Sequence, residues 1–150
     1  MVSGRLIYLI ESHQEEIANR ILHAIHCDTE LVHAHQLHEL ELRKRGRQIL
    51  KNLGHWLAEG NEAELAKEYE SVGKARYEES VPLHESVRML CITKDKMVDF
   101  VLQHGMTKDS LELYAEEELE HRLGRFFDLL VIHLVRGYEG AWRRAMHAAA

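Results

Sequence analysis

The sequence has few residues of the kinds that interrupt helices or build disulfide frameworks. A single proline, Pro82, in 150 residues and the rarity of β-branched clusters favour helices throughout. The two cysteines, Cys27 and Cys91, have no Cys-x-x-Cys spacing, which argues against a disulfide scaffold. Both lie among apolar residues, so we expect buried thiols in a protein of a reducing compartment.

Long apolar runs and an excess of positive charge are also lacking. The longest apolar run, residues 129–135, is interrupted by His133 and is too short to span a bilayer, and no signal-peptide pattern opens the sequence. The net charge is −6 with neutral histidines, and the basic cluster at residues 43–47 is flanked by acids. Nucleic acid is disfavoured as a partner, because phosphate binding needs a clustered cationic face. We therefore predict one cytoplasmic domain over residues 1–150, with neither nucleic acid nor membrane as partner.

The motifs of common enzymes are missing as well. The sequence contains no glycine-rich phosphate loop, no serine nucleophile elbow and no helical His-Glu-x-x-His. We therefore expect a non-enzymatic protein without catalytic residues, bound metal or cofactor.

What the sequence does contain is a series of helical patterns separated by local stop signals. Pro82 suits the first turn of a helix, and Asn61 with Glu64 forms a capping-box pattern directly after Gly60. These signals predict an all-α five-helix bundle with a long C-terminal helix. The expected helices cover about 4–27, 31–59, 61–79, 83–104 and, for the last and longest, about 110–144.

The beginnings of the first and last helices are less sharply marked. Ser3 can cap the first helix, and an alternative beginning is Ser12, with Glu15 in the capping-box position. The last helix begins within residues 107–110, with Thr107 as its earliest start. It would span roughly 50 Å at 1.5 Å per residue, which exceeds what a compact bundle of this size needs.

Histidines are abundant, and two Glu-x-x-His pairs resemble the ligands of a carboxylate-bridged di-metal bundle. One is Glu30 with His33 in "ELVHAHQLHEL", and the other is Glu118 with His121. At about 100° per helical residue, the second pair falls roughly 140° and 160° from Leu123, the centre of an apolar stripe. Glu30 also falls on the far side of its expected helix. Because a di-metal site needs ligands that point inward, we expect these pairs to face solvent.

Three histidines are candidates for sensing pH or a ligand. His35, with His38 beside it, falls at the inward edge of the expected 31–59 helix, and His133 lies beside the last apolar stripe. His35 is interpreted either as a half-buried histidine bonded to a carbonyl or carboxylate, or as a sensing group, because imidazole titrates near neutral pH. A metal-binding bundle built from histidines is an alternative. A haem sensor is another, with His133 as the best-placed axial ligand, although aromatic residues make up only 7% of the chain.

The last expected helix is dense in apolar residues over more than one face. Phe127 and Leu130 lie at the centre of its stripe, so we expect both to be well buried. Apolar residues continue past the expected end of the core, and a lone apolar stripe in water would be unstable. The commonest way to bury such a stripe is a two-fold symmetric dimer, in which the stripes of two chains form a dimer seam. We therefore expect a homodimer with contacts from Leu134, Tyr138 and Trp142.

The stretch around the single proline has a recognisable pattern. Arg76-Tyr77 is followed by Val81-Pro82-Leu83 and by the helical run "VPLHESVRMLCITKDKMVDFVL". Upstream stand "IANRILHAI", "LRKRGRQILKNLGHWLAEG" and "YESVGKARYEESV", and downstream stands "RFFDLLVIHLVRGYEGA". In this order the segments resemble the N-terminal domain of RsbR-type stress regulators, the RsbT co-antagonist family. The resemblance covers nearly the whole chain, through degenerate helix patterns.

The resemblance implies an all-helical sensory module that is globin-like without haem and commonly dimeric. In such proteins the module passes a signal to an attached STAS or kinase domain, and the family has no catalytic residues to carry over. This sequence ends at "MHAAA" without such a domain. We therefore expect either a fragment or a free-standing module with a protein partner of the stress-signalling type.

Overall fold

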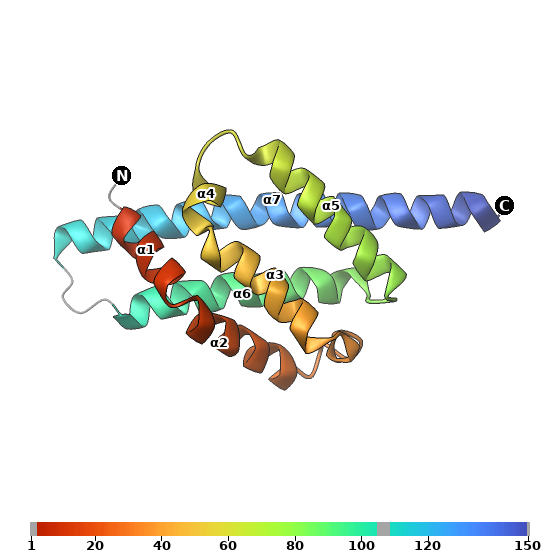
Figure 1. Cartoon of the computed structure of the whole chain (residues 1–150), viewed down its shortest axis with the longest axis horizontal. Helices are drawn as coiled ribbons and strands as arrows, with labels where there is room; N and C mark the ends of the chain where they lie inside the picture. Colours follow the sequence, from red (N-terminus) through yellow and green to blue (C-terminus); the bar gives the residue numbers. More distant parts are fainter. Residues whose placement is uncertain (1–2, 105–108, 150) are drawn as a thin grey trace.

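Helices make up every regular element of the described residues, 3–104 and 109–149, of the computed structural model (Figure 1). This confirms the all-α class that the sequence predicts. The expected start at Thr107 lies outside the described residues, and the last helix begins within them at Ser110. The elements are α1 (Gly4–Ser12), α2 (Gln14–Cys27), the 3₁₀ helix η1 (Ala34–Gln36), α3 (Glu39–Lys51), α4 (Leu53–Leu57), α5 (Glu62–Glu78), α6 (Leu83–His104) and α7 (Ser110–Ala149).

The first expected helix, 4–27, is divided into α1 and α2 at His13. This residue leaves the helical region, with φ −112° and ψ 27°, and its N–H donates to the carbonyl of Ile10. The expected beginning at Gly4 is confirmed by α1, and the alternative beginning at Ser12 falls one residue before the break. Ser12 does not cap α2, however, because its hydroxyl donates to the carbonyl of Tyr8 over 2.7 Å. The chain changes direction at the break, and α2 then packs against α3 and α6 (Figure 1).

The second expected helix, 31–59, is interrupted twice. Residues 28–38 form a loop that contains η1, and Asn52 separates α3 from α4 with φ −118°. His38 has an extended backbone and caps α3, because its Nδ1 accepts the N–H of Leu40 over 3.2 Å. The five predicted helices thus correspond to seven α-helices in the described part of the chain.

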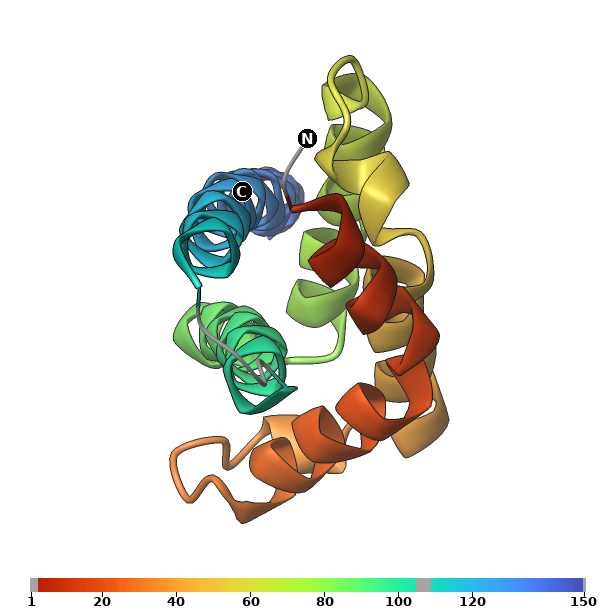
Figure 2. The same ribbon diagram turned by 90° about the vertical axis from the view of Figure 1, so that its left-hand side faces the viewer.

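The two longest helices, α6 and α7, run side by side in opposite directions (Figures 1 and 2). In the end-on view of Figure 2, α1, α3 and α4 form a layer facing this pair, and α2 lies beside α6. The helix α5 crosses α7 obliquely, and beyond this crossing the last turns of α7 extend from the bundle (Figure 1). None of the described helices is long and apolar enough to cross a membrane.

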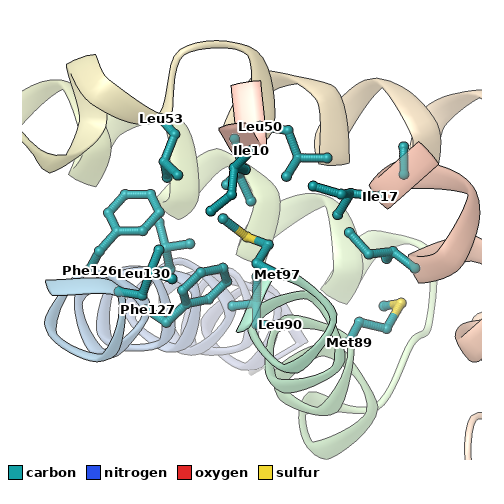
Figure 3. Packing of buried hydrophobic residues seen from close by; sticks show 14 of the residues in the cluster. Ile10, Ile17, Leu50, Leu53, Met89, Leu90, Met97, Phe126, Phe127 and Leu130 are labelled. Carbon is teal, nitrogen blue, oxygen red and sulfur yellow. The ribbon is translucent and has the colours of Figure 1, made fainter. Parts of the chain in front are cut away.

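The core lies between the α6–α7 pair and the layer of α1, α3 and α4 (Figure 3). Phe127 and Leu130 are 4% and 0% exposed, which confirms the predicted centre of the last apolar stripe. In Figure 3 their side chains face those of Met97 on α6 and Leu53 on α4. The helix phase predicted for α7 is therefore correct in this region.

The expectation of buried thiols is wrong, because Cys27 and Cys91 are both exposed. Cys91 follows Leu90, which is buried in the core. Successive helical residues are turned by about 100° from each other, and this step carries the Cys91 side chain off the buried face of α6. Apolar neighbours in the sequence were therefore a poor guide to the burial of the thiol.

Candidate functional site

Where α5 and α7 cross, their backbones touch, and two glycines allow this contact. A Cβ atom on Gly137 of α7 would overlap the carbonyl oxygen of Glu70 on α5. A Cβ atom on Gly73 of α5 would overlap the carbonyl oxygen of Leu134 and lie 2.8 Å from the backbone nitrogen of Tyr138. Because no side chain separates the helices here, the two backbones themselves set the crossing point. We refer to this contact as the glycine crossing.

The side chain of His133 is buried one turn before Gly137, on the same face of α7. The residue is 5% exposed, and neither ring nitrogen has a hydrogen-bond partner among the described residues. The carboxylate of Glu62 on α5 lies 3.8 Å from Nε2, which is beyond hydrogen-bond length. An unsatisfied buried polar group costs about 1–3 kcal/mol of stability. The crossing therefore carries a titratable side chain that the rest of the described chain leaves unsatisfied.

Tyr138 directly follows Gly137, and its side chain holds α7 against the turn between α5 and α6. Its hydroxyl donates to the carbonyl of Val81 over 3.0 Å, and its ring meets that of Tyr77 edge-on at 5.5 Å. Burial, together with the neighbouring Tyr77, raises the pKa of the Tyr138 hydroxyl. The turn is closed by the Val81 N–H, which donates to the carbonyl of Arg76, with Ser80 in the left-handed region at φ 60°. The Tyr138 side chain therefore makes contacts within its own chain.

The three residues predicted for a dimer seam have different environments. Leu134 is 2% exposed and belongs to the core, so its side chain is not available to a second chain in this structure. Tyr138 is half-buried and bonded to Val81, whereas Trp142 is 50% exposed near the C-terminal end of α7. The prediction for Leu134 fails because α5 crosses the apolar stripe at that point, which the periodicity of α7 alone does not reveal.

The structure does not bring His35 and His38 to His133. His35 lies in the loop before α3, where its Nε2 donates to the carbonyl of Ile25 over 2.9 Å, and the residue is exposed rather than inward-facing. His38 is also exposed and caps α3. Both side chains have backbone partners. For His35, the hydrogen bond of the structural alternative is present, but the expected half-buried position is wrong.

A buried carboxylate that the sequence analysis did not single out holds this loop against α6. Glu85, in the first turn of α6, is 1% exposed and accepts the N–H groups of His33 and Ala34 over 2.9 and 3.1 Å. Its second oxygen lies 2.7 Å from Nδ1 of His33. Burial raises the pKa of Glu85, but these hydrogen bonds outweigh it and hold the pKa below its ordinary value. The burial of Glu85 could have been inferred from helical spacing. Glu85 precedes the buried Met89 and Thr93 by four and eight residues, so it lies on the same face of α6.

The two Glu-x-x-His pairs are only partly exposed. His121 is exposed as predicted, but Glu118 is half-buried and accepts the hydroxyl of Ser3 over 2.7 Å. In the other pair Glu30 is exposed, whereas His33 reaches a buried carboxylate. Among the described residues, no three His, Cys, Asp or Glu side chains are grouped to hold a metal ion. Neither pair is therefore part of a metal-ligand group in the described structure.

Comparison with known proteins does not assign a family. No protein-family model, curated protein or solved structure matches this chain. A functional proposal therefore rests on the residues and the geometry of the chain itself.

Proposed function

We propose that this chain is a non-enzymatic signalling module of the RsbR type, which relays a stimulus through α7 to a partner or output domain of the STAS or kinase kind. The observation that carries this proposal is the geometry of α7. This helix runs over 40 residues, touches α5 at the glycine crossing, and extends from the bundle (Figure 1). The order of the segments around Pro82 that resemble RsbR-type regulators supports the same assignment.

The glycine crossing is suited to act as a pivot. From Gly137, α7 continues for twelve residues to Ala149, which is roughly 18 Å at 1.5 Å per residue. Backbones in contact have no flexible side chains between them, so a shift of α5 passes to α7 as a rigid-body movement. Next to the crossing, Nε2 of His133 on α7 lies 3.8 Å from the carboxylate of Glu62, the first residue of α5. A proton on His133, or a ligand bonded to its ring, would change the forces at the crossing and thereby the position of α7.

We also propose that two copies pair through the last turns of α7. Trp142 and Met146 lie one turn apart on the same face and are 50% and 56% exposed. Pairing with a second copy would remove this apolar surface from water, and two-fold symmetry would let a movement of one α7 be transmitted to the other. Leu134 is not part of this proposed dimer contact, because its side chain is buried in the core of its own chain.

The test is the oligomeric state of a variant with charges at the proposed seam. Trp142→Glu combined with Met146→Glu should weaken the dimer at least tenfold, about 1.4 kcal/mol, in sedimentation equilibrium at tens of micromolar. The matched control is Leu40→Glu, since Leu40 is 69% exposed on α3, and this variant should remain dimeric. A wild-type chain that is monomeric throughout this concentration range would contradict the proposed pairing.

A further inference from the structure

The outer side of α3 concentrates positive charge in a chain that is acidic as a whole. From Glu39 to Lys51 the helix has five basic and two acidic residues, which is a net charge of +3. The whole chain has a net charge of −6, so the residues outside α3 have −9. Figure 2 shows α3 in the layer that covers the core, with its other side turned outward.

Four of the five bases lie on this outer side at helical spacing, together with one apolar side chain. A groove of about 400 Å³ runs along it, and its walls include Leu40, Arg43, Lys44, Arg47 and Lys51. Leu40 is 69% exposed, and Lys44, Arg47 and Lys51 are also exposed. We refer to these five residues as the basic face.

The acids of α3 itself leave most of this charge in place. Glu41 lies to one side of the basic face, where its carboxylate bonds Arg45 at 3.0 Å and Arg76 of α5 at 3.3 Å. Glu39 lies to the other side, with 3.7 Å between its Oε1 and Nη2 of Arg43. One of the two acids next to the basic run in the sequence is therefore turned away from it in the structure.

One further carboxylate reaches the basic face from a neighbouring helix. Glu15 of α2 pairs with Arg47, and its other oxygen lies 3.9 Å from Nη1 of Arg43. Lys44 and Lys51 have neither an ion pair nor a hydrogen bond among the described residues. Four cations thus face two carboxylates, and the two lysines carry the excess of positive charge.

The cations of the basic face have the spacing of residues on one face of a partner helix. Lys44 and Lys51 are seven residues apart, which is about 10 Å along the axis, and Arg47 lies between them. Leu40 precedes Lys44 by about one turn. We propose that the basic face binds an acidic helical segment of a partner protein. Carboxylates four and three residues apart on that segment pair with Lys44, Arg47 and Lys51, and an apolar side chain one turn away packs on Leu40.

Other anionic partners match this face less well. A single phosphate does not span the roughly 10 Å between the two lysines. A nucleic acid extends beyond the basic face and meets the net charge of −9 that the rest of the chain carries, because screening at physiological salt extends over only about 8 Å. Insertion into a bilayer surface requires several apolar side chains, and the basic face has one, Leu40. A short acidic helix matches the charge, the length and the apolar content together.

Two labelled peptides of identical composition test the proposal with the full chain. Both are alanine-based helices of about sixteen residues that contain glutamates and one leucine. The first carries these residues on one face, with the glutamates four and three residues apart, and the second distributes them around the helix. In fluorescence anisotropy the first peptide should bind at least about threefold more tightly, because only its carboxylates reach all three cations together. Raising the salt from about 50 to 500 mM should weaken this binding at least about tenfold, because the cations are exposed.

Substitutions locate the contact. Lys44→Glu combined with Lys51→Glu should weaken binding of the first peptide at least about tenfold, since attraction becomes repulsion. Lys67→Glu combined with Lys74→Glu is the matched control. These two lysines are exposed and also seven residues apart, on α5, so the change in net charge is the same. The control variant should bind the peptide within about threefold of the wild type. Circular dichroism spectra and melting profiles like those of the wild type show that both variants are folded.

Four outcomes would overturn the proposal. One is the absence of binding of the first peptide at about 1 mM protein and low salt. Equal affinity of the two peptides would show that the spacing of the acids has no role. Equal loss in the two double variants would show that net charge, and not the basic face, attracts the peptide. Tighter binding of a DNA duplex, or of vesicles containing phosphatidylserine, would assign the face to a different polyanion. None of these measurements depends on dimerisation or on signalling through α7.

Discussion

Glu85 and His133 are both buried polar side chains, and their surroundings are opposite. Glu85 is 1% exposed, and its carboxylate bonds two backbone N–H groups and the ring of His33. His133 is 5% exposed, and its ring has no hydrogen bond within the described residues. Buried polar groups are satisfied in the great majority of cases, so each exception calls for an explanation. The Glu85 junction is thus closed by hydrogen bonds, whereas the buried ring of His133 has none within the described residues.

The two regions also differ in what holds them together. Residues 28–38 have little regular structure, and the carboxylate of Glu85 replaces the backbone hydrogen bonds that a longer helix would have made there. The glycine crossing instead joins two complete helices through direct backbone contact. Loss of a hydrogen bond should therefore harm the first region, and added volume should harm the second.

The largest loss of stability is expected at the glycine crossing, where it tests how closely the backbones of α5 and α7 pack. Gly137→Ala should lower the free energy of unfolding by about 3 kcal/mol, the upper end of typical overpacking, because its Cβ atom would overlap the Glu70 carbonyl oxygen. Gly124→Ala on the same helix is the control, since nothing lies within 4 Å of its added Cβ atom. That variant should gain about 0.5–1 kcal/mol from helix propensity. Similar urea denaturation curves for the two variants would show that α5 can move aside freely.

A smaller loss of stability is expected from a substitution at Glu85, whose carboxylate is fully hydrogen-bonded. Glu85→Gln keeps the shape of the side chain but removes its negative charge. With its amide oxygen on the N–H groups of His33 and Ala34, its NH2 group takes the place of the oxygen that lies 2.7 Å from Nδ1 of His33. At pH 7 it should lower the free energy of unfolding by about 2 kcal/mol, in the range of a hydrogen bond to a charged group. Asp95→Asn, at an exposed acid of the same helix, should have little effect in the same denaturation measurement.

The difference between wild type and Glu85→Gln should also depend on pH. Because the folded pKa is lowered, the contribution of ionised Glu85 is complete above the ordinary carboxyl value of 4.5. It is lost as the pH falls through the lower folded pKa, so the stabilities of the two proteins should converge in acid. Denaturation midpoints measured from neutral to acidic pH provide the check. A constant gap would mean that the charge of Glu85 does not strengthen its hydrogen bonds.

The smallest effect that we expect is a gain in stability. His133→Leu should raise the free energy of unfolding by about 1 kcal/mol, because it replaces an unsatisfied buried ring with an apolar side chain. His121→Leu, at an exposed position of the same helix, should stay within about 0.5 kcal/mol of the wild type. Thermal and urea denaturation measure both variants. If His133→Leu were instead destabilising, the ring would have a partner in the folded protein, and its contrast with Glu85 would disappear.

Prediction of the helices succeeded where local signals were strong. The expected ranges 61–79 and 83–104 agree closely with Glu62–Glu78 and Leu83–His104. Asn61 stands at the N-cap of α5 as predicted, although its side chain makes no capping hydrogen bond, and Pro82 precedes the first residue of α6. The expected range 31–59 failed, since nothing in its periodicity indicates that a distant carboxylate competes for its backbone N–H groups. The count of five α-helices failed because the chain also leaves the helical conformation at His13 and at Asn52.

For the candidate site, the structure gives the positions of the predicted residues, and their proposed roles remain predictions. His133 attracted attention because it interrupts an apolar run, and the structure places it at a buried crossing. Leu134 was assigned to a dimer seam because its stripe continues toward the C-terminus, yet α5 covers it. The roles of Gly73 and Gly137 were not predicted, since a glycine in a helical pattern does not show which helix approaches it.

By itself, the sequence determined the helical class, the phase of the apolar stripe of α7 and the boundaries of α5 and α6. These features depend on the period of the helix and on residues within a few positions of each other, so they can be read locally. Only the tertiary structure decided that Glu85 bonds His33, that α5 touches α7 at two glycines, and that His133 is buried without a bond. Each of these depends on residues more than 50 positions apart, whose contact is set by the packing of whole helices and not by the pattern within any one of them.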